Sequence, residues 1–224
     1  TVQEEVNKMF RYIRPDVVIH LAALVSGIQD NINRPADHFE DNILMNSFMV
    51  QMAHKFNTHH FIGMLSTCIY PDTSLIYPLT ENDIHSGPPT ETNFSYAYAK
   101  RCMAVQIDAC NKQHGTDYSY LIPCNVFGKQ DKFDEGRSHF MGALIRKIYE
   151  AKRDGQDSIT LYGTGKALRQ YIHADDVAKI IKYCVENEVY KNMNVAPDEE
   201  YSIAELVHIA LCACECGNMT IKYD

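Results

Sequence analysis

The sequence lacks any apolar run that approaches the ~18 residues of a bilayer-crossing helix, so no membrane span is expected. It also lacks the pattern of a secretory leader. Its eight cysteines show no disulfide-framework spacing, which in a chain of 224 residues is typical of reduced thiols. These absences favour a cytoplasmic protein.

Positive charge is also scarce. Lys and Arg number 21 against 29 Asp and Glu, and the net charge of −8 argues against a nucleic-acid-binding surface. A phosphorylated small ligand stays open, because it needs only a local basic cluster. With 46% hydrophobic and 22% charged residues, the composition is that of a globular protein with one large domain, or a domain plus a small lobe.

What the sequence does contain is the stretch Ser95–Lys100, in which Tyr96 and Lys100 lie four residues apart. This spacing puts both side chains on one face of a helix. The charge of Lys100 should favour the phenolate and lower the tyrosine pKa from its usual value near ~10. Such a tyrosine can act as a general acid at a carbonyl oxygen while a hydride reaches the carbon. The spacing alone is weak evidence, because it occurs by chance in many helices.

Three short apolar segments with the character of buried strands surround this pair. They alternate with helical patterns, which predicts βαβ units and a right-handed parallel sheet. The helix that carries Tyr96 and Lys100 should end before Gly115. The expected strands are Asp16–Ala23, His60–Ser66 and Asp117–Pro123, with a helix over 41–55 and another ending at His114.

The remaining segments predict a proline-rich loop over 71–92 and a change of texture from residue 129. We expect residues 1–128 to form a Rossmann-like sheet domain and 129–224 a smaller interleaved α/β lobe, with 169–190 returning to the sheet. The chain opens on Thr1 and stops after a strand-like run, so a fragment of a longer protein is expected. Further helices are expected over 2–12, 140–153, 174–188 and 203–214, and strands over 158–162 and 219–223.

Ser66 at a strand end, followed by Tyr96 and Lys100, resembles the Ser–Tyr–Lys set of the short-chain dehydrogenase/reductases. The resemblance covers essentially the whole chain. Segments similar to the extended, nucleotide-sugar branch are His20–Ala23, Pro123–Gly128 and Arg169–Asp176. Segments that resemble the GDP-L-fucose synthases in particular are Leu65–Pro71, Gly87–Pro89 and Ser138–His139.

The pairing of Ser66 with Cys68 is the most specific of these motifs. Related sugar-nucleotide dehydratases have an Asp-Glu pair where this chain has Cys68-Ile69, and simple 4-epimerases lack the cysteine as a base. Two alternatives stay open. One is a reductase or epimerase for a different 4-keto-sugar nucleotide, and the other is a non-catalytic fragment.

The resemblance implies an enzyme that takes GDP-4-keto-6-deoxy-mannose, epimerises C3 and C5, and reduces the C4 ketone with NADPH. The ketone acidifies the neighbouring protons, so a base can remove them through an enolate. Cys68 matches the family's base and His139 its acid. A thiol works as a base only if its pKa falls from ~8.5 toward neutrality. A histidine can donate a proton near neutral pH without a large shift.

The resemblance further implies that Tyr96, oriented by Ser66 and Lys100, handles the C4 oxygen in both stages. It assigns cofactor contacts to Leu21, Ala22, Ala23, Tyr96 and Lys100, and substrate contacts to Asn125, Lys147 and Arg169. It gives 1–128 the character of a partial NADP-binding domain and 129–224 that of a partial substrate-binding lobe. It also implies a homodimer for the full-length protein.

Some features depart from the family or lie outside it. None of the eleven glycines forms the Gly-rich dinucleotide fingerprint expected after a first strand. Cys212, Cys214 and Cys216 with His208 suggest zinc, but the spacing is not that of a structural site, so we favour core packing and expect no metal. Residues 31–34 are most simply a surface segment.

Overall fold

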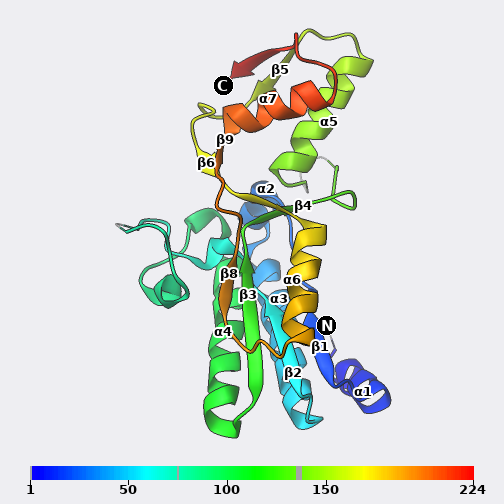
Figure 1. The fold of residues 1–224 in the computed structure, drawn as a ribbon, viewed down its shortest axis with the longest axis vertical. Coiled ribbons are helices and arrows are strands. Elements are labelled where there is room, and N and C mark those ends of the chain that lie inside the picture. The colour runs from blue at the N-terminus through cyan, green and yellow to red at the C-terminus, as the bar shows by residue number, and fades with distance from the viewer. Residues whose placement is uncertain (1, 75, 135–137) are drawn as a thin grey trace. The chain divides into compact units, whose positions relative to one another are not determined.

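The computed structural model describes residues 2–74, 76–134 and 138–224 and divides into two compact units (Figure 1). The first unit consists of the chain up to Cys124 together with Asp175–Val195. The second consists of Asn125–Ala174 and Ala196–Asp224. The chain therefore leaves the first unit after Cys124, returns to it at Asp175, and leaves it again after Val195.

A four-stranded parallel sheet forms the centre of the first unit (Figure 1). Its order is β1 (Val17–His20), β2 (His60–Met64), β3 (Asp117–Pro123) and β8 (Met193–Val195). The prediction of a parallel α/β sheet is confirmed, and β3 has the bounds expected from the sequence. Because the strands are parallel, their carboxyl ends meet at one edge, where α/β proteins bind ligands.

The helices of this unit begin and end at recognisable signals. Pro35 opens α3, where its missing N–H costs nothing, and Gly115 ends α4 with a φ of 65°. Three short 3₁₀ turns, η1 (Thr67–Ile69), η2 (Glu81–His85) and η3 (Glu91–Asn93), lie between β2 and α4. The helices are α1 (Gln3–Ile13), α2 (Ile28–Asn33), α3 (Pro35–Lys55), α4 (Phe94–His114) and α6 (Ala174–Glu186), whose residues from Asp175 on belong here.

The main core lies between α1, α3, α4 and one face of the sheet, and it includes Val18, Phe61 and Met103. Side chains alternate along a strand, so Ile19 faces the opposite way and lines a hollow with α6. Gly63 lets α4 approach β2 closely, because a Cβ there would lie 3.1 Å from Ile107 Cδ1. The close approach brings the start of α4 to the end of β2.

In its described residues, the second unit contains three separate strand pairs and two helices. Its core joins both helices to β5 through Leu144, Ile148 and Val207. The pairs are β4 (Asn125–Phe127) with β7 (Tyr171–His173), β6 (Leu168–Arg169) with β9 (Tyr201–Ser202), and β5 (Ser158–Leu161) with β10 (Thr220–Tyr223). The helices are α5 (Phe140–Arg153), with the expected bounds, and α7 (Ile203–Ala213).

The unit boundaries differ from the expected ones. The returning segment is Asp175–Val195 rather than 169–190, because β7 pairs with β4 inside the second unit, whereas β8 completes the sheet of the first. The strands β4, β6, β7, β8 and β9 have only two or three residues each, too few to show a hydrophobic period. Across the described residues, no helix has the length and apolar character needed to cross a membrane.

Residues 31–34 are not simply surface. Asn31 is buried, and its side-chain amide donates to the carbonyls of Ser26 and Gly27, each at 3.1 Å. The asparagine thereby holds the chain that follows β1. Asn31 belongs to α2, which packs against η3 and α3, and this packing could not be read from the polar character of the segment.

Candidate functional site

Ser66 and Cys68 lie just beyond the carboxyl end of β2. Ser66 has extended backbone (φ −163°, ψ 151°) and precedes the η1 turn, which closes through a bond from Ile69 N to Ser66 O of 3.1 Å. The turn folds Cys68 back over Ser66, and the Cys68 thiol donates to Ser66 Oγ at 3.2 Å. The Ser-x-Cys motif is therefore one hydrogen-bonded unit rather than two independent side chains.

The first turns of α4 bring Tyr96 and Lys100 to the same place. Lys100 is 1% exposed, and its Nζ donates to the carbonyl of Met64, at the end of β2, at 2.7 Å. The same Nζ lies 5.7 Å from the centroid of the Tyr96 ring. Tyr96 is half-buried, and Met103 and Ile107 continue its face into the core, as the helical spacing predicts. The structure thus gathers Ser66, Cys68, Tyr96 and Lys100 at one sheet edge.

Burial dominates the electrostatics of this group. It lowers the pKa of Lys100 to about 8, although the neighbouring Cys68 acts in the opposite direction. Burial raises the pKa of the Cys68 thiol, and the bond to Ser66 and the charge of Lys100 oppose that rise. Ser66 and Lys100 therefore both favour the thiolate of Cys68, but burial outweighs them in this structure.

The expected direction of the Tyr96 shift is wrong. Burial raises the pKa of Tyr96 well above its ordinary value, and Cys68 adds to the rise. Desolvation of the phenolate exceeds the attraction of a cation that is itself buried. Tyr96 is consequently a protonated phenol at neutral pH, which is the form a proton donor requires.

The segment after β1 is held by α3. Asn42 is buried, and its side chain accepts from Leu24 N and donates to Leu24 O, both at 3.0 Å. The Asn42 amide also donates to His38 O at 2.7 Å. Leu21 and Ala22, which precede this anchor, are exposed. The anchor thus leaves the expected cofactor segment accessible while it fixes its far end.

A second contact ties β1 to both helices. Asn46 Oδ1 lies 2.9 Å from His20 Nε2, and the Asn46 amide donates to Ala99 O at 3.4 Å, one residue before Lys100. Burial lowers the pKa of His20 to about 4. Sequence reasoning missed Asn42 and Asn46. Their signal was present, because His38, Asn42 and Asn46 recur every four residues along one face of a helix.

A nicotinamide cofactor, implied by the resemblance, can be tested against these groups. An ammonium has three donors, and the described hydrogen bonds of Lys100 use one of them, to Met64 O. Lys100, the phenol of Tyr96 and the exposed residues Leu21 and Ala22 lie at the carboxyl edge of the sheet, where such a cofactor binds. These residues fit its nicotinamide and ribose end, whereas the Gly-rich turn for its phosphates is not in the sequence.

The other predicted residues belong to the second unit. His139 is the exposed residue immediately before α5. Asn125 donates to Gln170 O at 2.9 Å, which ties it to the residue after Arg169. The Lys147 ammonium donates to Thr160 O at 2.9 Å, and an Arg169 guanidinium nitrogen donates to Leu168 O at 2.7 Å. Their side chains thus bond to nearby backbone on an accessible surface.

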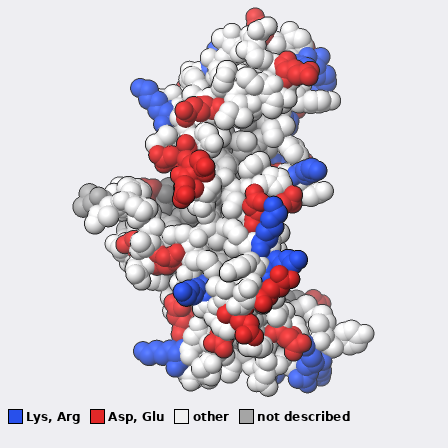
Figure 2. Space-filling model, in the orientation of Figure 1, with Lys and Arg blue, Asp and Glu red and all other residues white. Residues whose placement is uncertain are grey.

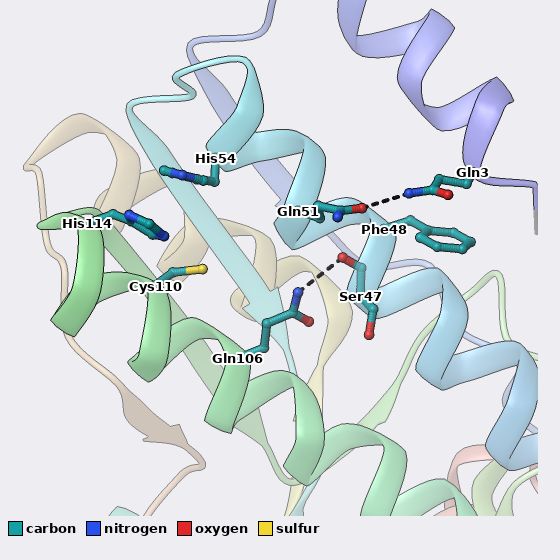
Figure 3. Close-up of a pocket in the computed structure, with 8 residues that line it drawn as sticks. All are labelled: Gln3, Ser47, Phe48, Gln51, His54, Gln106, Cys110 and His114. Atoms are coloured by element: carbon teal, nitrogen blue, oxygen red, sulfur yellow. Dashed lines mark hydrogen bonds between the residues drawn. The ribbon is translucent and has the colours of Figure 1, made fainter.

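A hollow of about 400 Å³ lies away from this site, between α3 and α4 (Figure 3). At its end the rings of His54 and His114 stack at 3.9 Å, and Cys110 points toward the space. A bond from Gln106 to the Ser47 carbonyl, 3.2 Å long, crosses the same groove. None of the predicted site residues lines this hollow, and its end at His114 lies fourteen residues beyond Lys100, about 20 Å along the helix.

The cysteine cluster near the C-terminus is only partly as expected. Cys214 and Cys216 pack against the core of the second unit, but Cys212 and His208 are exposed, so the prediction of core packing is wrong for these two. They lie on the face of α7 that turns away from Leu211 and Val207. Within the described ranges, no group of three or more potential ligands has the geometry to hold a metal ion.

The chain matches known proteins over most of its length. Residues 1–196 match the model of the NAD dependent epimerase/dehydratase family. A GDP-L-fucose synthase of Dictyostelium discoideum is 37% identical over 95% of this chain and 67% of its own length. A GDP-L-colitose synthase of Yersinia pseudotuberculosis is 33% identical over 91% and 67%, respectively. The chain thus spans about two thirds of the length of these relatives.

The chain is also similar to solved structures of proteins with related names. A GDP-L-fucose synthetase of Naegleria fowleri bound to NADP superposes with a TM-score of 0.88 and 30% identity, over all of this chain and 70% of that one. The resemblance read from the sequence is therefore confirmed, as are the Rossmann-like fold and the assignment to oxidoreductases and epimerases. By sequence and by fold, the chain belongs to the NAD dependent epimerase/dehydratase family.

Proposed function

We propose that the protein is a GDP-sugar epimerase–reductase that converts GDP-4-keto-6-deoxy-mannose to GDP-L-fucose with NADPH. One observation carries the proposal: Cys68 is bonded to Ser66 beside the Lys100 ammonium and the Tyr96 phenol. This group supplies a base for epimerisation and a proton donor for reduction at one place. The proposal is supported by relatives named GDP-L-fucose synthase and by the NADP in the Naegleria fowleri structure.

Epimerisation begins when Cys68 removes the proton from C3 or C5, whose acidity comes from the C4 ketone. The thiol must first lose its own proton. Lys100 and Ser66 favour the thiolate, whereas burial of Cys68 opposes it. A ligand that changes this burial would therefore change the fraction of thiolate. His139 then returns a proton to the opposite face of the sugar ring, which inverts the carbon.

Tyr96 serves the C4 oxygen in both stages. As a protonated phenol it donates a hydrogen bond to the enolate oxygen, and the buried Lys100 stabilises the charge that develops there. NADPH, when bound, supplies the hydride for the reduction of C4. Tyr96 then transfers its proton to the alkoxide, and the neighbouring ammonium stabilises the phenolate that remains.

The nucleotide part of the substrate is assigned to the second unit. Arg169 suits a diphosphate because a guanidinium makes two parallel hydrogen bonds to phosphate oxygens. Lys147 adds a second cation, and Asn125 contributes an amide. All three keep part of their side chain near solvent, so they can exchange their present carbonyl partners for a ligand.

The proposal is tested by incubating the full-length protein with GDP-4-keto-6-deoxy-mannose in D₂O without NADPH. Deuterium should appear at C3 and C5, as measured by NMR or mass spectrometry. Cys68→Ser should lose the exchange, whereas Cys212→Ser, an exposed thiol on α7, should keep it. Absence of deuterium at both carbons in the wild-type protein would overturn the proposal.

A second candidate is an enzyme for a different 4-keto-sugar nucleotide. The similarity to a GDP-L-colitose synthase favours it, because that relative is nearly as similar as the fucose synthases. Assaying NADPH oxidation with a panel of 4-keto-sugar nucleotides separates the two. No oxidation with any member of the panel would instead favour a non-catalytic protein.

A cytoplasmic homodimer completes the proposal. An exposed stripe on α4 includes Tyr98, Cys102 and Val105, which recur at helical spacing and suit a helix-to-helix contact. Sedimentation of the wild-type protein and Val105→Lys tests the dimer, and a wild-type monomer would refute it.

The distribution of charge agrees with a small-molecule substrate. On the face seen in Figure 2, basic side chains of the described residues stand in small groups among acidic ones and form no broad basic surface.

A further inference from the structure

Arg101, the residue after Lys100, has no role in the chemistry described above, yet it is 5% exposed. Its Nε donates to the carbonyl of Ile69 at 2.6 Å. Ile69 is the last residue of η1, the turn that carries Cys68. The guanidinium also lies 5.3 Å from the centroid of the Tyr98 ring. The buried guanidinium of Arg101 therefore binds the end of the η1 turn, which carries Cys68.

Lys100 and Arg101 act on the two ends of one short segment. Lys100 Nζ bonds to Met64 O, and Arg101 Nε bonds to Ile69 O. Ser66 and Cys68 lie between these two carbonyls. Two consecutive residues of a helix project about 100° apart, which lets one side chain reach the start of the segment and the next reach its end. The loop after β2 is thus clamped to α4 at both ends.

Stability alone does not account for a buried arginine here. Burying a guanidinium carries a desolvation cost that an apolar side chain of similar volume avoids. One hydrogen bond to Ile69 O returns only part of that cost, and Arg101 Nη2 is buried with no hydrogen-bond partner in the described part of the chain. What the arginine adds is a donor at a defined point, which fixes the position of the η1 backbone.

We propose that Arg101 is a positioning residue for Cys68: its bond to the Ile69 carbonyl fixes the turn that aims the thiol at the substrate. The effect is specific to Cys68 for a geometric reason. Ser66 lies two residues beyond the strand and next to the Lys100 anchor, and Tyr96 sits on α4 itself. Cys68 is the site residue adjacent to Ile69, so it moves most when that anchor is released.

The inference rests on the proposed function, because it concerns the base of the epimerisation. The test compares two rates in the full-length protein: deuterium exchange at C3 and C5 without NADPH, and NADPH oxidation with a substrate already in the final C3/C5 configuration. Arg101→Met keeps the stem and removes the donor. We expect exchange to fall about 10- to 100-fold and reduction to stay within about threefold.

Arg101→Lys restores a cation and a donor, so exchange should recover at least partly. Arg11→Met, an exposed arginine on α1, is the matched control and should change neither rate. If Arg101→Met does not fold, Arg101→Lys carries the test, because its shorter side chain should still lower exchange more than reduction. Equal losses in both rates, or no loss in either, would overturn the proposal.

A second measurement needs no substrate. Alkylation of Cys68 by iodoacetamide can be followed as a function of pH, with mass spectrometry to identify its peptide among those of the other thiols. Release of the turn should relieve the burial that raises the pKa of the Cys68 thiol, so the alkylation profile of Arg101→Met should move to lower pH. An unchanged profile would refute the positioning role. Wild-type protein without exchange would refute the proposed function, whereas wild-type exchange with an unaffected variant would refute only the role of Arg101.

Discussion

The candidate residues of the two units differ in how the protein holds them. In the first unit, Lys100 is buried and bonded to the carbonyl at the end of β2, and Cys68 is bonded to Ser66. In the second unit, Arg169 is exposed and bonded to the carbonyl of the residue before it. The first group is fixed before any ligand arrives, whereas the second can change partners.

This difference matches the tasks proposed for the two groups. Proton and hydride transfer depend on atomic positions, so their residues need backbone anchors and suffer large pKa shifts through burial. Recognition of a diphosphate needs charge that a flexible ligand can reach. Substitutions in the first unit should therefore reduce catalysis or stability strongly, and those in the second should weaken binding with little effect on folding.

The largest effect is expected at Tyr96. Tyr96→Phe removes the phenol proton and keeps the ring, so reduction of the C4 ketone should fall about 10³-fold, equivalent to about 4 kcal/mol. NADPH oxidation by the full-length protein measures it. Tyr12→Phe, at an exposed tyrosine of α1, should stay within about twofold. Equal rates for the two variants would refute the role of Tyr96.

The next effect concerns His20, whose folded-state pKa of about 4 lies below the ordinary 6.5. Between these values the unfolded chain binds the proton more readily. The contribution of neutral His20 to the free energy of unfolding is therefore complete above pH 6.5. It is lost as the pH falls toward 4, which lowers that free energy by about 3 kcal/mol. Urea unfolding at several pH values measures it. His20→Asn should flatten this part of the pH profile, and His59→Asn, at an exposed position, should not. Identical profiles would contradict the prediction.

Arg169 tests the second unit. Arg169→Ala should raise KM for the sugar nucleotide about 10- to 100-fold through lost charge-assisted bonds, while kcat changes little. Its free energy of unfolding should stay within about 0.5 kcal/mol of wild type, because the side chain is exposed. Steady-state kinetics and urea unfolding measure the two quantities. Arg153→Ala, an exposed arginine in the last turn of α5, is the control. A large loss of stability in Arg169→Ala would contradict the prediction that substitutions in the second unit weaken binding with little effect on folding.

The smallest effect is expected at Gly115, which ends α4 with a φ of 65°. An added Cβ would meet no atom within 4 Å, so Gly115→Ala tests backbone conformation alone. It should cost about 1 kcal/mol of unfolding free energy, and Gly115→Asn should cost less. Thermal or urea unfolding measures both. Gln113→Ala, an exposed position in the same last turn, should be close to neutral, and a similar loss there would show that the effect is not specific to the glycine.

Local sequence determined the long elements and the chemical identity of the site. The apolar segments at 60–64 and 117–123 and the helix that ends at Gly115 were all readable, because their periods and end signals extend over many residues. The same holds for Tyr96 and Lys100, whose spacing follows from helix geometry. By contrast, β4, β6, β7, β8 and β9 exist only because distant segments pair, so no local pattern marked them.

Only the tertiary structure decided the electrostatics and the anchors. The sequence predicted that Lys100 lowers the pKa of Tyr96, but burial of both groups reverses the direction, and burial depends on packing. The carbonyls of Met64 and Ile69 are present in any sequence, so their use by Lys100 and Arg101 could not be read from it. Residue types thus determined which reactions the chain can catalyse, and the close packing of α4 on β2 decided how the reacting groups are held.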